Sequence, residues 1–349
     1  METSLPPYKS APKTATPTIL KLHSNTRMKK MRHIYILSCE TDGGIYHYFF
    51  EKGKLQFVEK TRLDRPMYAI IRENKLYVVL REIDKITRFG GLLSFDIDEN
   101  GNLINPTEIE STNGIVPCHL EVTDKGKYIV KYLSGNIVKM GEKIVTHKGN
   151  GIHPTRQEAP HTHFVTTSPD KKYILCTDLG LDKTFVYTMN LEKVSEVDAP
   201  KGHGPRHLIF SGDGKMCFVA NELESTVTAF QYNDGKLDAV NTVSCIPDDG
   251  IVNSTASAIR FSNGFVYVSN RGHNSIAVMQ FINNKLRFIN TIDCFGNFPR
   301  DFQILGDYII STNEKSNDIS VIDKNSLKLI DMVKNIPAPV CVVYDEMRK

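Results

Sequence analysis

Four residues in the middle of the chain have side chains that can activate water and stabilise negative charge: His163, Arg206, Glu222 and Arg271. A histidine whose pKa lies near neutral can take a proton from water. Arginines are permanent cations that can stabilise an oxyanion or bind a phosphate or carboxylate. A glutamate beside them can orient an arginine or act as an alternative base. The set therefore predicts acid–base chemistry, provided that the fold brings the four together.

A second group of polar residues stands at comparable positions, next to the ends of apolar runs. An asparagine after a strand often only caps a turn, and a single histidine is as often structural as functional. We treat the group as candidate substrate-binding residues: His119, His161, His207, Asn221, Asn270, His273 and Arg300. The sequence has no Cys/His metal spacing, cofactor motif or G-x-S-x-G motif. It therefore predicts no metal, no cofactor and no serine nucleophile.

A short repeated motif supplies the elements that must position these residues. It has one or two small or polar residues, an alternating apolar stretch, and an aromatic or apolar end, as in GGIYHYFF and STVTAFQY. The copies recur every 43 to 49 residues, starting at Gly43, Gly90, Gly135, Asp182, Ser225, Asn274 and Asn317. Strand-like alternation at this period is typical of a β-propeller.

Further strand-like runs and turn residues flank each copy, which gives a unit of four strands. The sequence predicts an all-β, seven-bladed β-propeller with four-stranded antiparallel blades over residues 31–349. The run from Pro339 to Tyr344 has the pattern of a first strand without a second, and His33 to Ser38 that of a second strand without a first. We expect these N- and C-terminal strands to pair in one blade and close the ring. Residues 1–30 lack the period and are predicted to be a disordered extension.

Antiparallel pairing brings the start of a blade's first strand and the end of its second strand to the same face, around the mouth of the central channel. His163 and Arg206 stand at first-strand starts, and Glu222 and Arg271 at second-strand ends. Matching the blades by their turns places the first two at one level of the channel and the last two at another. We therefore expect all four on neighbouring blades, along one wall of the mouth.

The composition argues against several other classes of protein. The 43 Lys and Arg residues nearly balance the 40 Asp and Glu residues and are scattered, so we predict no nucleic-acid-binding surface. No apolar stretch is long enough to span a membrane. The seven cysteines are odd in number and far apart, which favours reduced thiols and a cytoplasmic location. We expect a small-molecule substrate, and a monomer or weak homo-oligomer.

Several long motifs make the chain similar to a known family, the seven-bladed propeller lactonases. This family includes propeller-type 6-phosphogluconolactonases and carboxy-cis,cis-muconate lactonizing enzymes. The resemblance covers nearly all of residues 31–349 and rests on PCHLEV, RQEAPHTHFVTTSPDKKYILCTDLGLDK, GHGPRHLIFSGDGKMCFVANELESTVTAF and VSNRGHNSIAVMQF. It implies a metal-free active site made of His163, Arg206, Glu222 and Arg271. The chain departs from the family at Lys131, where an asparagine is usual.

Three functions remain open from the sequence. The resemblance implies hydrolysis of a sugar lactone, with 6-phosphogluconolactone of the pentose phosphate pathway as the expected substrate and 6-phosphogluconate as the product. The second is a lactonizing cycloisomerase reaction on a carboxymuconate-like dicarboxylic acid, whose carboxylates the same residues would bind. The third is a non-catalytic propeller that binds a ligand or protein on its faces. The absence of tryptophan argues against a WD40-type scaffold.

Overall fold

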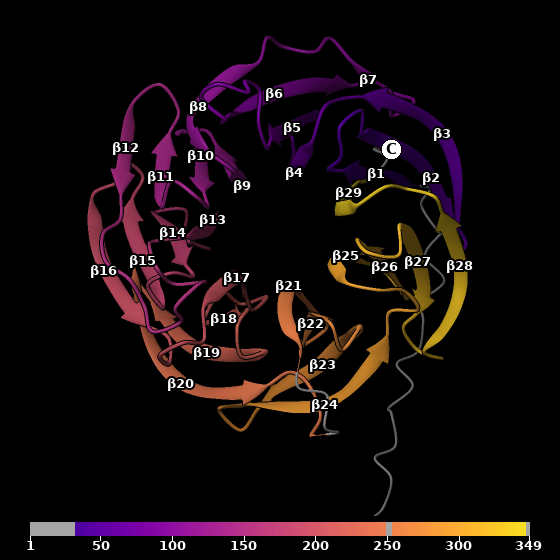
Figure 1. Ribbon diagram of the computed structural model, residues 1–349. Helices are drawn as coiled ribbons and strands as arrows, with labels where there is room; N and C mark the ends of the chain where they lie inside the picture. The colour runs from indigo at the N-terminus through magenta and orange to yellow at the C-terminus, as the bar shows by residue number, and fades with distance from the viewer. Residues whose placement is uncertain (1–31, 249–252, 347–349) are drawn as a thin grey trace, which may run out of the picture.

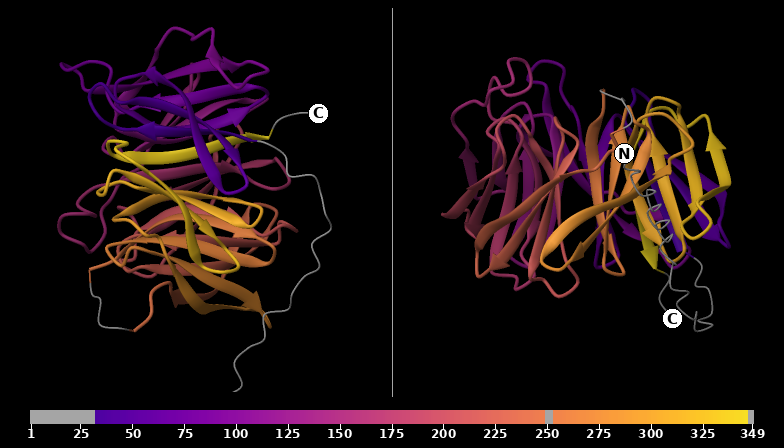
Figure 2. Two further views of the ribbon diagram at one scale, coloured as in Figure 1. Left: turned by 90° about the vertical axis from the view of Figure 1, so that its right-hand side faces the viewer. Right: turned by 90° about the horizontal axis from the view of Figure 1, so that it is seen from below.

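Seven β-sheets surround a central axis in the computed structural model, which describes residues 32–248 and 253–346 (Figure 1). Every regular element within these residues is a strand. The first strand of each sheet lies nearest to the axis, and the later strands lie farther out (Figure 1). Seen from the side, the strands run between the two faces of the ring (Figure 2). The predicted seven-bladed β-propeller is thus confirmed, whereas the predicted extension of residues 1–30 lies outside the described residues.

Five blades are built from four consecutive strands, with the first strand innermost. Blade three contains β9 (Pro117–Thr123), β10 (Gly126–Lys131), β11 (Asn136–Lys139) and β12 (Lys143–Thr146), and blade four contains β13 (Thr162–Thr167), β14 (Tyr173–Asp178), β15 (Lys183–Thr188) and β16 (Lys193–Asp198). Blade five contains β17 (Pro205–Phe210), β18 (Met216–Asn221), β19 (Thr226–Asn233) and β20 (Lys236–Ser244). Blade six contains β21 (Thr255–Ser262), β22 (Phe265–Arg271), β23 (Ser275–Ile282) and β24 (Lys285–Asp293), and blade seven contains β25 (Pro299–Leu305), β26 (Tyr308–Asn313), β27 (Asp318–Asp323) and β28 (Lys328–Lys334).

The two ends of the described chain meet in blade one. Its first strand comes from the C-terminal end and its other strands from the N-terminal end, in the order β29 (Pro339–Glu346), β1 (Arg32–Ser38), β2 (Gly44–Glu51) and β3 (Lys54–Arg62). Strands β29 and β1 pair antiparallel, with Leu37 opposite Cys341. This pairing closes the ring as predicted, because it joins the first strand of the described chain to the last.

Blade two departs from the predicted four strands. It contains β4 (Pro66–Arg72), β5 (Lys75–Leu80), β6 (Phe89–Ile97), β7 (Leu103–Ile104) and β8 (Glu110–Ile115). Only two residues of β7 pair with β6, at its Asp96–Ile97 end. The other end of β6 pairs with β8 instead, from Phe89 to Leu92. The outer strand of this blade is therefore divided in two, and the sheet has five strands.

The small or polar residue that opens each repeat has a conformational role. The third strands begin within one residue of the predicted repeat starts, as β11 at Asn136 and β19 at Thr226 illustrate. The residue before several of them has a positive φ, including Gly135 (55°), Asn274 (58°) and Asn317 (57°). Glycine and asparagine tolerate this left-handed conformation better than other residues. The repeat was therefore readable because several of these tight turns favour a few residue types.

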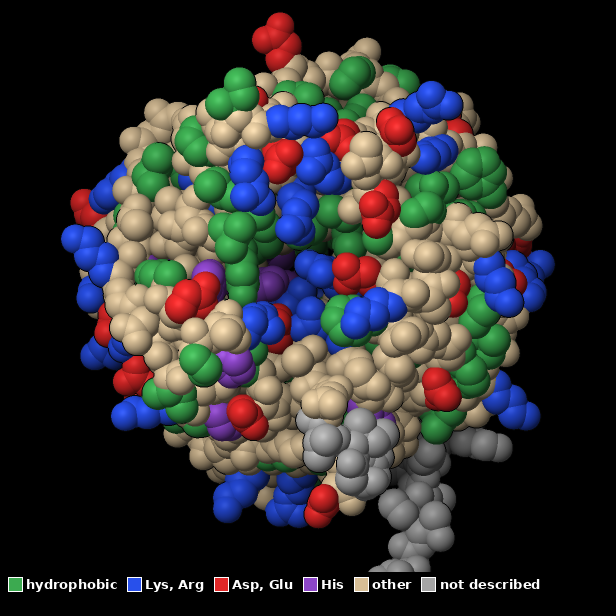
Figure 3. Space-filling model, in the orientation of Figure 1, with side chains coloured by type: hydrophobic (Ala, Val, Ile, Leu, Met, Phe, Trp, Pro, Cys, Tyr) green, Lys and Arg blue, Asp and Glu red, His purple; other side chains and the backbone are tan. Residues whose placement is uncertain are grey.

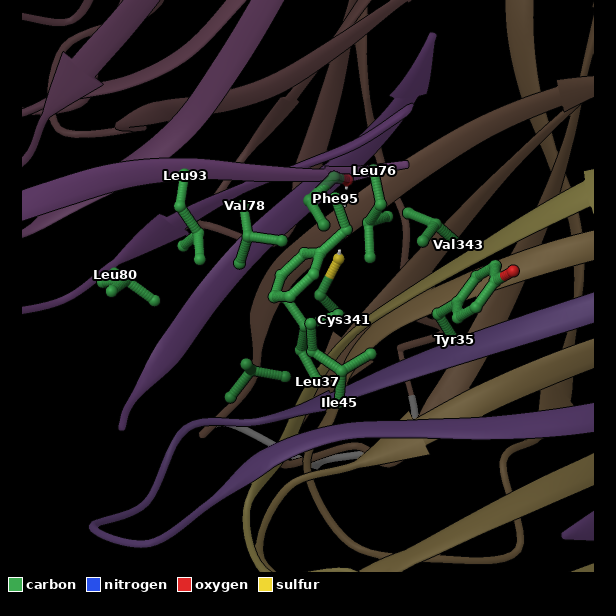
Figure 4. Packing of buried hydrophobic residues seen from close by; sticks show 12 residues of the cluster. Tyr35, Leu37, Ile45, Leu76, Val78, Leu80, Leu93, Phe95, Cys341 and Val343 are labelled. Atoms are coloured by element: carbon green, nitrogen blue, oxygen red, sulfur yellow. Dashed lines mark hydrogen bonds between the residues drawn. The ribbon is translucent and has the colours of Figure 1, made fainter. Parts of the chain in front are cut away.

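Apolar side chains from neighbouring blades pack against each other around the whole ring. Between blades one and two, Leu37 and Ile45 pack with Leu76, Val78 and Phe95 (Figure 4). Comparable buried clusters lie between the other pairs of adjacent blades. Burying one such side chain contributes about 1.5–3 kcal/mol. The core thus lies between the blades, which leaves polar residues free to occupy the axis.

Candidate active site

Strand register places the predicted catalytic residues at one end of the ring. In blade five, Pro205 at the start of β17 pairs with Asn221 at the end of β18, so Arg206 and Glu222 are neighbours. His163 follows the first residue of β13 in blade four, and Arg271 is the last residue of β22 in blade six. Figure 3 looks along the axis and shows a hollow at the centre of the ring with basic and histidine side chains inside it.

Glu222 lies at the centre of this cluster. Its Oε2 atom is 3.0 Å from Arg206 Nε and 3.0 Å from Arg271 Nη2, and 3.9 Å from His163 Nε2. Its Oε1 atom accepts a hydrogen bond from Arg156 Nη2. The side chain of Glu222 is only 4% exposed, and that of Arg206 only 3%. One shielded carboxylate therefore contacts three guanidiniums and faces an imidazole.

Burial and charge together set the protonation states in the cluster. Burial alone would raise the pKa of Glu222, but Arg271, Arg206, His163 and Arg156 hold that pKa well below its usual range. Burial, assisted by Arg206, keeps the pKa of His163 well below its ordinary value. Burial and Arg271 lower the pKa of Arg206 to about 9. At neutral pH the site therefore combines a charged carboxylate, charged arginines and a neutral imidazole.

Several buried side-chain nitrogen atoms in the cluster have no hydrogen-bond partner among the described residues. They include Nδ1 of His163, Nη1 of Arg206 and Nε of Arg271. An unsatisfied buried polar group costs about 1–3 kcal/mol, so such groups are rare away from functional sites. Three of them on adjacent blades mark a place where a polar ligand can bind.

An aromatic layer lies next to the cluster inside the channel. The His119 ring lies 4.1 Å from Tyr68 and 3.9 Å from Phe164, and the His207 ring lies 4.8 Å from Phe164 and 5.6 Å from His163 (centroid distances). Burial keeps the pKa of both His119 and His207 well below the ordinary value. A small cavity adjoins this layer and is lined by Met67, Tyr68, Cys118, His163, Arg206, His207, Arg300, Asp301 and Val340. His207 is thus beside the cluster, whereas His119 is part of the packed layer and does not line the cavity.

The side-chain amides of the two candidate asparagines are used in structural hydrogen bonds. Asn221 Nδ2 donates to the hydroxyls of Thr226 and Thr228, at 3.0 and 2.9 Å. Asn270 Nδ2 donates to the carbonyl oxygen of Cys245 at 2.8 Å. Both asparagines are fully buried. Their amides hold turns and adjacent strands together, which is the structural role that the sequence also allowed, and the structure does not place them among the residues of the cluster.

The two remaining candidates, on blades six and seven, differ in their surroundings. Arg300 lines the small cavity, and its Nη1 atom forms a 3.0 Å ion pair with Glu314 Oε2. His273 Nδ1 lies 2.7 Å from the hydroxyl of Ser275, in the turn that follows Arg271. Arg300 therefore borders the small cavity, whereas the hydrogen bond between His273 and Ser275 lies within the turn.

One arginine of the cluster was missed by the sequence analysis. Arg156 lies between β12 and β13, in a segment without strand periodicity, and it binds Glu222. Its Nη2 atom also donates to the hydroxyl of Tyr132 at 3.4 Å. The Tyr132 ring stacks on His161, with centroids 4.3 Å apart and ring planes 9° apart. His161 thus supports Tyr132 and does not reach Glu222 itself. The only signal for Arg156 was its place in the RQEAPHTHF stretch.

Lys131, which departs from the family pattern, has a structural contact. Its side chain is fully buried, and burial lowers its pKa to about 8. Nζ donates to the carbonyl oxygen of Thr112 at 2.7 Å, and Thr112 lies in β8. Lys131 thus fastens the extra strand of blade two to blade three.

Neither a metal-binding group nor a membrane-spanning helix occurs among the described residues. Residues 32–248 and 253–346 contain no group of three or more His, Cys, Asp or Glu side chains placed to hold a metal ion. They also contain no helix with the length and apolar character needed to cross a membrane.

A family model, a bacterial relative and two crystal structures are similar to this chain. Residues 33–344 match the family model described as "Lactonase, 7-bladed beta-propeller". The chain is 32% identical to a 6-phosphogluconolactonase of Bacillus subtilis over 332 residues, which covers 86% of this chain and 94% of that protein. A crystal structure of a protein titled a putative 6-phosphogluconolactonase from Bacteroides fragilis superposes with a TM-score of 0.80 at 27% identity, covering 93% of this chain and all of that one. A similarly titled protein from Bacteroides uniformis gives the same TM-score and identity over 90% of this chain and 99% of that one.

Proposed function

This chain belongs to the seven-bladed β-propeller lactonase family, and we propose that it hydrolyses 6-phosphogluconolactone to 6-phosphogluconate at the Glu222 cluster. The observation that carries the proposal is the convergence of three guanidiniums and a neutral histidine on one buried carboxylate. Hydrolysis of a lactone needs a base for water and cationic donors for the carbonyl oxygen, and this group of side chains supplies both.

In the proposed mechanism His163 is the general base. With Nε2 facing Glu222, the ring proton belongs on Nε2, and the lone pair is on Nδ1, which has no hydrogen-bond partner among the described residues. Nδ1 takes a proton from water while the water oxygen bonds to the lactone carbonyl carbon. When the ring C–O bond breaks, the imidazolium returns this proton to the departing ring oxygen. Glu222 stabilises the transient imidazolium, since its carboxylate lies 3.9 Å from Nε2.

Arg206 and Arg271 stabilise the oxyanion in this mechanism. Both are buried, both retain donors that the protein leaves unpaired, and Glu222 holds both from one side. Donors that are fixed before the reaction stabilise a developing charge without reorganisation, and their effect is larger where water is excluded. Glu222 therefore acts as the group that orients the two arginines.

The charge of the cluster favours an anionic substrate. Three guanidiniums share one carboxylate, which leaves two positive charges without a matching negative charge. A phosphate monoester carries about −1.5 to −2 charges at pH 7. A phosphorylated sugar lactone therefore matches the excess charge better than an uncharged one.

Replacing Arg206 with alanine tests this assignment. We expect kcat for 6-phosphogluconolactone to fall by about 10²–10³, which is the typical effect of losing one oxyanion donor. Added guanidinium ion at millimolar concentration should restore part of the activity, because it can enter the space of the lost side chain. Arg72→Ala is the control, since Arg72 ends β4 and forms its ion pair with Glu73. Full lactonase activity in Arg206→Ala would rule out this role for Arg206.

A further inference from the structure

Arg156 differs from the other two arginines that contact Glu222. Its side chain is 36% exposed, whereas Arg206 is 3% and Arg271 is 7% exposed. It binds Oε1 of Glu222, and the two buried arginines lie at Oε2. Arg156 therefore stands on the solvent side of the carboxylate, where a substrate must enter.

Most donors of Arg156 remain available. Among residues 32–248 and 253–346, its side-chain hydrogen bonds are made through Nη2, to Glu222 and to the hydroxyl of Tyr132. A guanidinium has five N–H donors in a planar fork that matches phosphate and carboxylate oxygens. Nε and Nη1 can therefore bind an anion while Nη2 stays on Glu222. The ion pair with Glu222 also raises the pKa of Arg156, against the effect of burial, so the charge is permanent.

The segment that carries Arg156 is firmly anchored. At its start, His147 Nδ1 lies 2.6 Å from Asp178 Oδ2, and at its end the backbone N–H of His161 donates to Asp178 Oδ1 at 2.8 Å. Gln157, next to Arg156, is fully buried and donates to the carbonyl oxygen of Leu179 at 2.8 Å. The backbone beside Arg156 is thus fixed to blade four, and the guanidinium is presented from a rigid support. Preorganised cations of this kind bind anions with a small entropic cost.

Tyr132 adds a second polar group at the same place. Its hydroxyl contacts Arg156 Nη2, and its ring is held by stacking on His161 and by an edge contact with His163 at 5.6 Å. Burial raises the pKa of Tyr132, so the hydroxyl keeps its proton and can donate it in a hydrogen bond. A cation and a hydroxyl donor therefore stand together at the outer side of the cluster.

We propose that Arg156, assisted by Tyr132, binds the phosphate group of the substrate and so selects phosphorylated over unphosphorylated sugar lactones. This inference rests on the proposed lactonase function and assigns a different task to each arginine. Arg206 and Arg271 act on the reacting carbonyl oxygen, and Arg156 acts on the distant anionic substituent. Glu222 connects the two tasks, because it holds all three guanidiniums.

The test compares 6-phosphogluconolactone with glucono-δ-lactone in the wild type, Arg156→Gln and Arg156→Lys. We expect Arg156→Gln to lower kcat/KM for the phosphorylated lactone by about 10–100-fold, mainly through KM, which corresponds to the loss of hydrogen bonds to a charged group. Activity on glucono-δ-lactone should fall less, so the ratio of the two kcat/KM values should shift toward the unphosphorylated lactone, and lysine should restore part of the loss. Arg72→Gln is the control, since its side chain is 38% exposed and its polar contacts are with Glu73 and the carbonyl oxygen of Val122.

A binding measurement separates this inference from the proposed function. Inorganic phosphate should raise the Tm of the wild type and should have little effect on Arg156→Gln. The inference is overturned if phosphate stabilises Arg156→Gln as much as the wild type, if it stabilises neither protein, or if both lactones lose activity equally. A wild type that hydrolyses neither lactone contradicts the proposed function, and the phosphate measurement then decides the role of Arg156 alone.

Discussion

Replacing His163 with glutamine should lower kcat for lactone hydrolysis by about 10²–10⁴, which is the usual contribution of a general base. Glutamine has a similar size and keeps polar atoms near Glu222, but it cannot take a proton from water at neutral pH. The pKa of His163 lies well below its ordinary value, so the wild-type ring is already neutral and ready to act as a base at pH 7. Steady-state kinetics on 6-phosphogluconolactone, corrected for spontaneous hydrolysis, measure the effect.

The matched control is His153→Gln. His153 lies between β12 and β13, in the segment that leads to His163. Its Nδ1 atom has a weak 3.4 Å contact with the backbone N–H of Thr155. We expect this variant to keep wild-type activity. Thermal unfolding of both variants checks that the fold is intact. If His163→Gln keeps more than about a tenth of wild-type kcat with an unchanged Tm, His163 is not the base, and Glu222 becomes the alternative.

Replacing Glu222 with glutamine should lower the free energy of unfolding by about 3–5 kcal/mol, because removing one partner of a buried ion pair leaves uncompensated charge. Here the carboxylate compensates three guanidiniums at once. The pKa of Glu222 is lowered in the folded state, so its stabilising effect is present above the unfolded-state pKa of about 4.3 and is lost as the pH falls through the folded-state value. The difference between wild type and Glu222→Gln should therefore be constant from about pH 5.5 to pH 8.

Glu314→Gln is the comparison for this experiment. Glu314 is 24% exposed and, within the described residues, its ion pair is with Arg300, so its loss should cost about 0–1 kcal/mol. Urea unfolding of the three proteins gives both differences. Equal stability of Glu222→Gln and the wild type would contradict the central place that Glu222 holds in the cluster.

The fold was predictable in part because several tight turns before third strands favour a few residue types. Gly135, Asn274 and Asn317 mark these turns through their left-handed backbone conformation. The division of the outer strand in blade two could not be read in the same way. The short β7 and the irregular β8 have no alternating pattern, and β8 is fixed by a long-range contact between Lys131 and Thr112.

The candidate site was predictable where strand ends fix a position. His163, Arg206, Glu222 and Arg271 stand at strand ends, so antiparallel pairing alone brings them to one mouth. Arg156 lies outside the strands, so strand pairing gives no position for it. Residue type also does not reveal where a side chain points. Asn221 bonds within blade five, and Asn270 of blade six bonds to Cys245, which follows the last strand of blade five. The catalytic roles of the four clustered residues stay predictions.

The most direct test of the proposed function is a pair of parallel assays. The purified wild-type protein is incubated with 6-phosphogluconolactone in one and with a carboxymuconate-type dicarboxylic acid in the other. We expect saturable hydrolysis of the lactone above its spontaneous rate and no conversion of the dicarboxylic acid. Lactone formation from the dicarboxylic acid without faster lactone hydrolysis would instead identify a cycloisomerase. No reaction with either compound would contradict the lactonase proposal and favour a propeller that only binds its ligand.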